Sequence, residues 1–244
     1  EMDHVAILSA SLTYVRETCR PERWFYLFLY LLINVVTCAI VPLYAGYLYR
    51  VMEAKPGIPE VSKIRELFVN GWKMNIACIL YTVQVLLLGL IFLFLSWGTV
   101  TGIFSGAVLT EEVAVGFRMN FLVFILILII VSFGIGLFST LGIVRMARSG
   151  KIREAFNFTG ILSAIRRIGW SDYIAAILIL IVCSFLFSIV LEFLGFAFSF
   201  LVDIIGSMMM MFLFIWMLVY ILLAAAFAVF IARYMSKVYY EGNA

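Results

Sequence analysis

The side chains that usually carry out enzymatic chemistry are scarce in this sequence. His4 is the only histidine, which excludes a metal or haem site built from paired histidines within one chain. The glycine patterns of nucleotide-binding sites and the motifs of hydrolases and zinc proteases are also missing from the sequence. We therefore expect a protein that is not an enzyme, with no catalytic residue, no cofactor and no metal site.

The cysteines are expected to be packing residues. The sequence contains four of them without CxxC spacing, namely Cys19, Cys38, Cys78 and Cys183. Three lie inside apolar runs, where a thiol behaves as a small apolar side chain.

Four polar side chains lie within apolar stretches and are candidates for an ion or substrate path: Asn34, Gln84, Glu192 and Asp203. Ionisable groups inside a bilayer are costly and commonly mark functional sites. Glu192 and Asp203 are about three helical turns apart and would share one helix face. Glu192 also lies roughly 28 Å of helical rise beyond Tyr173, which favours the outer membrane surface. The acid pair is therefore either part of that surface or the lining of a pathway.

The composition is that of an integral membrane protein. The chain is 66% hydrophobic and 13% charged, against about a quarter charged in soluble domains, and its mean hydropathy is +1.16. We predict an all-α, polytopic membrane helix bundle of about five to six membrane segments, since about 20 helical residues cross a bilayer core. The predicted segments are residues 24–49, 75–97, 121–144, 173–191 and 207–232, in a single transmembrane domain over residues 24–244.

The first of these segments allows two arrangements. Residues 24–49 either cross the membrane once, as a helix bent at Pro42, or double back as a shorter re-entrant pair. Pro21 is expected to end one helix and to open the next.

Amphipathic segments accompany the spans. The N-terminal segment, residues 1–23, is expected to form a helix on the membrane surface with one apolar side made of Val5, Leu8, Leu12 and Val15. Interfacial helices are expected over about residues 60–72 and 151–170. The second would lay one apolar face into the headgroup region, and that face consists of Ile161, Ala164, Ile165 and Ile168.

A charged hexamer occurs twice, as KIRELF at residues 63–68 and as KIREAF at residues 151–156. Each copy follows a span that ends in a basic residue, and a Gly-Trp pair and a new span come after it. This order predicts an internal parallel repeat. The Lys and Glu of each copy are spaced to pair weakly on a helix, and the glycine would let the chain turn from lying flat to crossing the membrane.

The basic and indole side chains around these hexamers are the candidates for lipid or partner contact. Lys and Arg near a membrane surface bind anionic headgroups with about 1 kcal/mol per residue, and tryptophan favours the interface. The candidates are Lys63, Arg65, Trp72, Lys73, Lys151, Arg153, Arg166, Arg167 and Trp170.

The distribution of positive charge predicts the orientation. Residues 50–73 and 145–167 hold five and six Lys plus Arg, whereas residues 98–120 hold one. Cation-rich loops stay in the cytoplasm, so we predict a multi-pass protein of the cell membrane with both KIRE segments and the C-terminus inside. A cytoplasmic N-terminus is also expected, and it requires residues 24–49 to double back.

Several of these sequence elements resemble a known family. The stretch Gly46-Tyr47-Leu48-Tyr49-Arg50-Val51, the pair Gly71-Trp72 and the triplet Ile168-Gly169-Trp170 are similar to those of an uncharacterised family of polytopic membrane proteins. That family is widespread in archaea and is known only as a domain of unknown function. The resemblance covers about Tyr14 to Tyr239 and implies an all-helical integral membrane protein of archaeal origin. It implies no activity.

Two functions follow as hypotheses. The first is an accessory or scaffold protein whose cytoplasmic interfacial helices contact membrane lipid with anionic headgroups, a partner membrane protein or a second copy of the chain. The net charge of +3 is too small to indicate a nucleic-acid partner. The alternative is a small transporter or channel with a polar path near Asn34, Gln84, Glu192 and Asp203, because transporters are often built from repeats.

Overall fold

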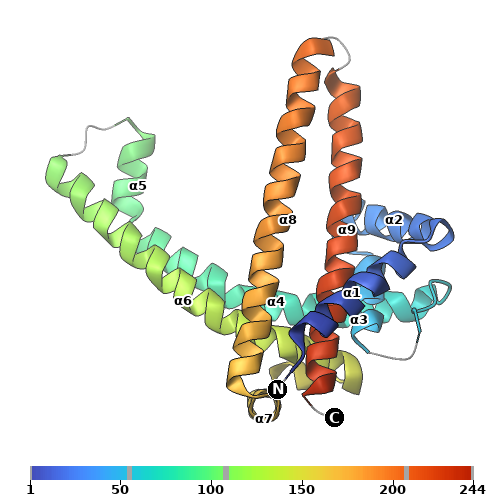
Figure 1. The fold of residues 1–244 in the computed structure, drawn as a ribbon. Helices are drawn as coiled ribbons and strands as arrows, with labels where there is room; N and C mark the ends of the chain where they lie inside the picture. The colour runs from blue at the N-terminus through green and yellow to red at the C-terminus, as the bar shows by residue number, and fades with distance from the viewer. Residues whose placement is uncertain (1, 54–56, 107–109, 206–208, 243–244) are drawn as a thin grey trace. The chain divides into compact units, whose positions relative to one another are not determined.

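The computed structural model describes residues 2–53, 57–106, 110–205 and 209–242 (Figure 1). Side chains are described in all of these except residues 22, 200–205, 209, 210, 212 and 213. The elements in this part of the chain are helices: α1 (His4–Thr18), α2 (Pro21–Val36), α3 (Leu43–Met52), α4 (Ile64–Leu95), α5 (Trp97–Phe104), α6 (Glu111–Ser149), the 3-10 helix η1 (Ile152–Phe156), α7 (Phe158–Ile168), α8 (Trp170–Ile205) and α9 (Met209–Glu241). The predicted all-α class is confirmed.

Four helices of the described residues are long and apolar enough to cross a membrane. Their spans are Ile64–Leu95, Glu111–Ser149, Trp170–Ser199 and Phe214–Glu241. Few of their apolar side chains are buried inside the protein. Such side chains are stable when lipid surrounds them, so the protein is a membrane protein.

The single bent helix considered for residues 24–49 does not form. The chain instead breaks after α2, where Cys38 and Ala39 adopt positive φ angles of 49° and 62°. Left-handed residues cannot continue a right-handed helix, and α3 then starts after Pro42, which occupies its N-cap position. The two helices have 16 and 10 residues and pack against each other, and neither has the roughly 20 residues of a full crossing. Pro21 occupies the first turn of α2, as predicted.

The chain divides into two compact units. One consists of Ile76–Thr140 and the other of Glu1–Asn75 together with Leu141–Ala244. Within Ile76–Thr140, aromatic rings of α4 and α6 stack, with Phe92 and Phe124 centroids 4.2 Å apart. Rings of Phe117 and Phe121 extend this cluster.

The larger unit contains the α8–α9 hairpin and a densely packed base. In the hairpin the two helices run side by side (Figure 1), and Phe187 stacks on Phe227 with centroids 4.2 Å apart. We call the base the junction assembly: α1, α3, residues 64–75 of α4, residues 141–149 of α6, η1, α7 and residues 230–241 of α9. Its core contains fully buried side chains from most of these segments, including Ile7, Tyr47, Leu67, Val144, Ile161 and Tyr234.

Two glycines permit close backbone contacts in the junction assembly. A Cβ atom on Gly46 of α3 would collide with the backbone of Leu67, and one on Gly71 of α4 would collide with the carbonyl of Pro42. Helices approach this closely only where a side chain is missing. Gly71 is therefore required for packing.

The Gly-Trp pairs differ in conformation between the two KIRE copies. In the first copy, α4 runs without interruption through Gly71 and Trp72, so residues 60–72 do not form a helix separate from the following span. In the second copy, Gly169 has φ of +96° and divides α7 from α8. The expected turn thus exists only in the second copy.

The apolar face of α7 is buried inside the protein and not in headgroups. Ile161, Ala164 and Ile165 have no exposed surface, because α7 packs on α8 and α9. An amphipathic pattern predicts that a face is covered and does not say by what. The lipid-embedded face predicted for this helix is wrong.

Helix α1 forms over His4–Thr18, and its most buried face lies beside its apolar stripe. Its inner face consists of Ile7, Ser11, Tyr14 and Thr18, and the hydroxyls of Ser11 and Thr18 donate to carbonyls of their own helix. Val5 and Leu12 are 75% and 55% exposed, whereas Leu8 and Val15 are half-buried. Leu8, Leu12 and Val15 line an apolar cavity together with residues of α8 and α9, so part of the stripe faces the α8–α9 hairpin.

Candidate functional site

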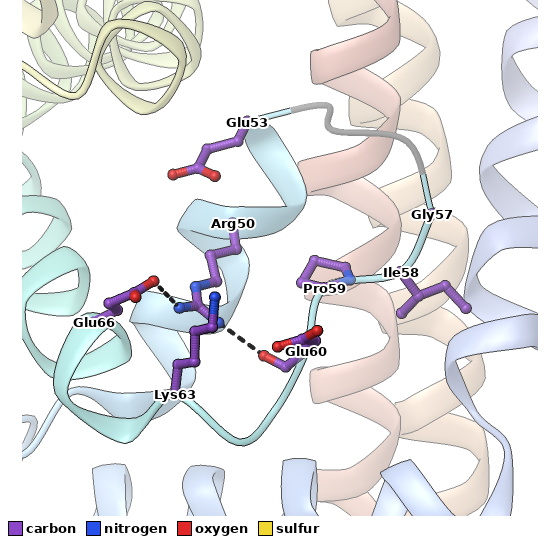
Figure 2. A pocket seen from close by; sticks show the side chains of 8 residues that line it. All are labelled: Arg50, Glu53, Gly57, Ile58, Pro59, Glu60, Lys63 and Glu66. Carbon is purple, nitrogen blue, oxygen red and sulfur yellow. Dashed lines mark hydrogen bonds and ion pairs between the residues drawn. The ribbon is translucent and has the colours of Figure 1, made fainter.

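The first KIRE segment is held by an arginine from the preceding helix. Arg50, in the last turn of α3, is only 9% exposed. Its Nη2 donates to Oε2 of Glu66 at 2.5 Å, and its Nη1 donates to the carbonyl of Glu60 at 2.8 Å (Figure 2). A guanidinium this buried requires hydrogen-bonded partners, and α4 and the segment before it provide them.

The second KIRE segment has the same kind of pair. Arg145, in the last turns of α6, donates from Nη2 to Oε2 of Glu154 at 2.5 Å. The Arg145 hydrogen bond and charge hold the pKa of the Glu154 carboxyl below its ordinary value. Asn157 donates to the same carboxylate and also caps α7 by accepting from the amide of Gly160. Gly160 has no side chain, which leaves room for the Arg145 guanidinium.

The partner that the structure shows for each KIRE glutamate differs from the sequence-based expectation. We expected Glu66 and Glu154 to pair with the lysine three residues earlier in the same hexamer. Each instead accepts from an arginine near the C-terminal end of the preceding helix. The sequence does contain a signal for this pairing, since a basic residue, Arg50 or Arg145, precedes each hexamer. A basic side chain at the packed end of a helix needs a counter-ion.

Hydrogen bonds tie the two copies to each other. Tyr49 donates to the carbonyl of Met146 at 3.0 Å. Lys73 donates to the carbonyl of Gly150 at 3.0 Å, and its Nζ lies 5.8 Å from the centroid of the Tyr49 ring. Lys73 therefore forms a hydrogen bond within the protein, whereas the sequence analysis predicted that it contacts lipid or a partner.

The end of α9 joins this network. Ser236 is fully buried and donates to the carbonyl of Met52 at 3.0 Å. Its own carbonyl accepts from Nη2 of Arg148 at 3.1 Å. The start of α4 and the ends of α6 and α9 thus meet in one assembly.

Most of the other candidates for lipid or partner contact lie on the surface. Lys63 precedes α4, Lys151 precedes η1, Arg153 lies within η1, and the remaining ones belong to α4, α7 and α8. Exposed side chains are those of Lys63, Arg65, Lys151, Arg153, Arg166, Arg167 and Trp170. Trp72 is half-buried within α4.

The intramembrane candidates do not assemble into one described site. Asn34 is half-buried in α2, and its Oδ1 has no hydrogen-bond partner among the described residues. Gln84 is exposed on α4 in the smaller unit. Glu192 lines a cavity of about 310 Å³ between α8 and α9, and Asn34 is not among the lining residues. The Asp203 side chain lies outside the described residues.

A second cavity, of about 280 Å³, surrounds the Arg50–Glu66 pair (Figure 2). Its walls carry two basic side chains, Arg50 and Lys63, and three acidic ones, Glu53, Glu60 and Glu66. The Arg50 guanidinium donates to both Glu66 and the carbonyl of Glu60. These two hydrogen bonds hold the connection between α3 and α4 against the end of α3. Within the described residues, no three His, Cys, Asp or Glu side chains lie close enough to hold a metal ion.

Comparison with known proteins gives a family and no activity. A protein-family model described as "Protein of unknown function (DUF4013)" matches residues 29–196. No curated protein and no solved structure gives a significant match. The family match spans α2 to α8 and includes both Arg–Glu pairs. The chain therefore belongs to this family of proteins of unknown function.

Proposed function

We propose that the protein is a membrane scaffold or accessory component whose junction assembly presents a basic surface to anionic lipid headgroups. One observation carries the proposal. The glutamate of each KIRE hexamer is engaged by an arginine of the preceding helix, whereas the lysine and arginine of both hexamers are exposed. The internal pairs offset the negative charges and leave positive side chains on the surface.

The location of this surface follows from the span ends. The start of α4, the end of α6, the start of α8 and the end of α9 all belong to the larger unit, and hydrogen bonds join three of them. Both KIRE segments then lie on the same side of the membrane. The positive-inside tendency assigns that side to the cytoplasm.

The same arrangement supports two finer features of the architecture. Each repeat unit consists of a helix with an arginine near its C-terminal end, a KIRE segment and an outgoing span, so the repeat is parallel. The α2–α3 pair is a re-entrant membrane segment that returns to the side on which it started, which adds a fifth membrane segment to the four spans. This arrangement also leaves the N-terminus in the cytoplasm.

Lipid retention by the full-length protein tests the proposal. The protein is purified in a mild detergent with mixed anionic and zwitterionic lipid, and the lipids that stay bound are quantified by native mass spectrometry. Removing one surface cation with Arg166→Gln should lower anionic-lipid retention about fivefold, because each such residue contributes about 1 kcal/mol. Arg118→Gln is the matched control, since it removes one exposed cation outside the KIRE units and should change nothing.

Equal retention by the Arg166→Gln variant and the wild type would contradict lipid recognition by this surface. A partner protein is a separate outcome of the same variants. Co-purification from native membranes, with wild type and Arg166→Gln compared, would then identify a protein that depends on the basic surface. The alternative of a small transporter or channel draws support from the cavity beside Glu192.

A further inference from the structure

The cavity beside Glu192 lies within the apolar part of the α8–α9 hairpin. Ten residues from Phe193 to Val202 separate Glu192 from Asp203, and nine of them are apolar or glycine; they add about 15 Å of helix beyond the carboxylate. On α9, Tyr220 lines the same cavity and lies about 20 Å of helix before Arg233. The carboxylate is therefore flanked by apolar helix in both directions.

No cation of these two helices can neutralise Glu192. Helix α8 contains no Lys or Arg, and α9 contains none before Arg233. A carboxylate in an apolar surrounding is costly without a positive partner. The hairpin thus places a negative charge where its own sequence supplies no counter-ion.

The other walls of the cavity are suited to an organic cation. Trp216 and Tyr220 lie beside Glu192, with Ser188, Leu191 and Gly195 completing the lining. Aromatic faces attract cations, tryptophan most strongly. The volume of about 310 Å³ is at the lower end of small-molecule pockets and exceeds what a bare metal ion needs. The single carboxylate and two hydroxyls are also fewer oxygen ligands than Ca²⁺ takes.

The indole is fixed in position by its neighbours. Phe198 packs on Trp216 with centroids 5.4 Å apart. On the facing helix, a Cβ atom on Gly195 would lie only 3.3 Å from the indole Cζ2, so the glycine permits the close approach of the ring. Tyr220 is 48% exposed, and Glu192 is exposed as well, which leaves the cavity open toward lipid.

We propose that the cavity formed by Glu192, Trp216 and Tyr220 binds a lipophilic organic cation that enters from the bilayer. The carboxylate supplies the opposite charge, the aromatic rings supply cation–π contacts, and the apolar walls accept the hydrophobic substituents of the ligand. This inference does not rest on the scaffold function, since the basic surface and this cavity share no residue.

Binding of tetraphenylphosphonium to the full-length protein in nanodiscs tests the site by equilibrium dialysis. We expect saturable binding by the wild type and at least about tenfold weaker binding by Glu192→Gln, because the compensating charge is lost. Trp216→Leu should weaken binding about two- to thirtyfold, and Glu192→Asp should retain part of the affinity. Glu241→Gln is the control, since it removes an exposed carboxylate of α9 outside the cavity.

Three results would overturn the proposal: no saturable binding by the folded wild type, equal binding by Glu192→Gln, or equal competition by triphenylphosphine oxide, an uncharged compound of similar bulk. A second measurement covers the case in which Glu192→Gln does not fold. Dicyclohexylcarbodiimide should modify Glu192 of the wild-type protein, and tetraphenylphosphonium should protect it. Unchanged modification in the presence of the cation would contradict the site.

Discussion

The hydroxyl of Tyr49, at the end of α3, donates a hydrogen bond to the carbonyl of Met146, near the end of α6. Each of these residues is next to an arginine that holds a KIRE glutamate, Arg50 on one side and Arg145 on the other. The two charged hexamers are thus parts of one packed assembly, and the bond between Tyr49 and Met146 links their anchors directly.

Removal of this bond should destabilise the protein. Tyr49→Phe keeps the ring that lies near Lys73 but removes one of the donors to the Met146 carbonyl, which still accepts from the amide of Gly150, in a region where Tyr49 and Met146 are both buried. The loss of one such hydrogen bond costs about 0.5–1.5 kcal/mol. We expect a lower midpoint of thermal unfolding in detergent, measured by tryptophan fluorescence. Tyr26→Phe, on an exposed ring of α2, should leave the midpoint unchanged.

The Arg50–Glu66 pair should contribute to stability in the same way. Arg50→Met fills a similar volume but removes the donors to Glu66 and to the carbonyl of Glu60. Hydrogen bonds to charged groups contribute about 1.5–3 kcal/mol, so the unfolding free energy should fall by an amount in that range. Arg65→Met removes an exposed arginine of the same hexamer and should change it by less than about 0.5 kcal/mol. Equal effects of the two substitutions would show that the Arg50–Glu66 pair is not stabilising.

Helix-interior glycines of α4 should respond oppositely to alanine. Gly71→Ala would drive a methyl group into the carbonyl of Pro42, and such overpacking costs about 1–3 kcal/mol or more. At Gly89 a methyl group would meet open space, so Gly89→Ala should be neutral or stabilising by up to about 1 kcal/mol. The recovery of monodisperse protein after detergent extraction, followed by thermal unfolding, measures both. A tolerated Gly71→Ala would contradict the close contact between α4 and the start of α3.

The Arg145–Glu154 pair predicts a pH dependence of stability. The pKa of the Glu154 carboxyl is lowered in the folded protein from an ordinary value of 4.5, because Arg145 donates a hydrogen bond to it. A lowered folded-state pKa contributes stability that is fully present above the ordinary value and is lost as the pH falls through the folded-state pKa. The difference in unfolding midpoint between wild type and Glu154→Gln should therefore be largest above pH 5 and should shrink on acidification. A difference that stays constant from pH 6 to pH 3 would argue against the charged pair.

The proposed orientation can be measured by cysteine accessibility. In a background with the native cysteines replaced by serine or alanine, Lys151→Cys should be protected from a membrane-impermeant maleimide in intact cells and should react after permeabilisation. Glu112→Cys, in the first turn of α6, should react in intact cells, because α6 carries the chain to the other side. The reverse pattern of labelling would place the junction assembly outside the cell.

The sequence by itself determined the class of protein and the position of its spans. Apolar runs such as those around Leu86, Ile130 and Val182 are long enough to cross a bilayer whatever surrounds them, and each lies in one of the four spanning helices. Local chemistry was also sufficient for the start of α2 at Pro21.

Only the tertiary structure decided how identical local patterns are used. Gly71 and Gly169 both precede tryptophan, yet one lies inside a continuous helix and the other in a positive-φ turn. At Gly71 the carbonyl of Pro42 lies where a Cβ atom would be, a contact between segments that local propensity does not encode. The same reason applies to Glu66 and Glu154. The spacing within each hexamer favoured an ion pair between the glutamate and the lysine three residues earlier. Tertiary packing instead places each glutamate against an arginine of the preceding helix, which needs a counter-ion.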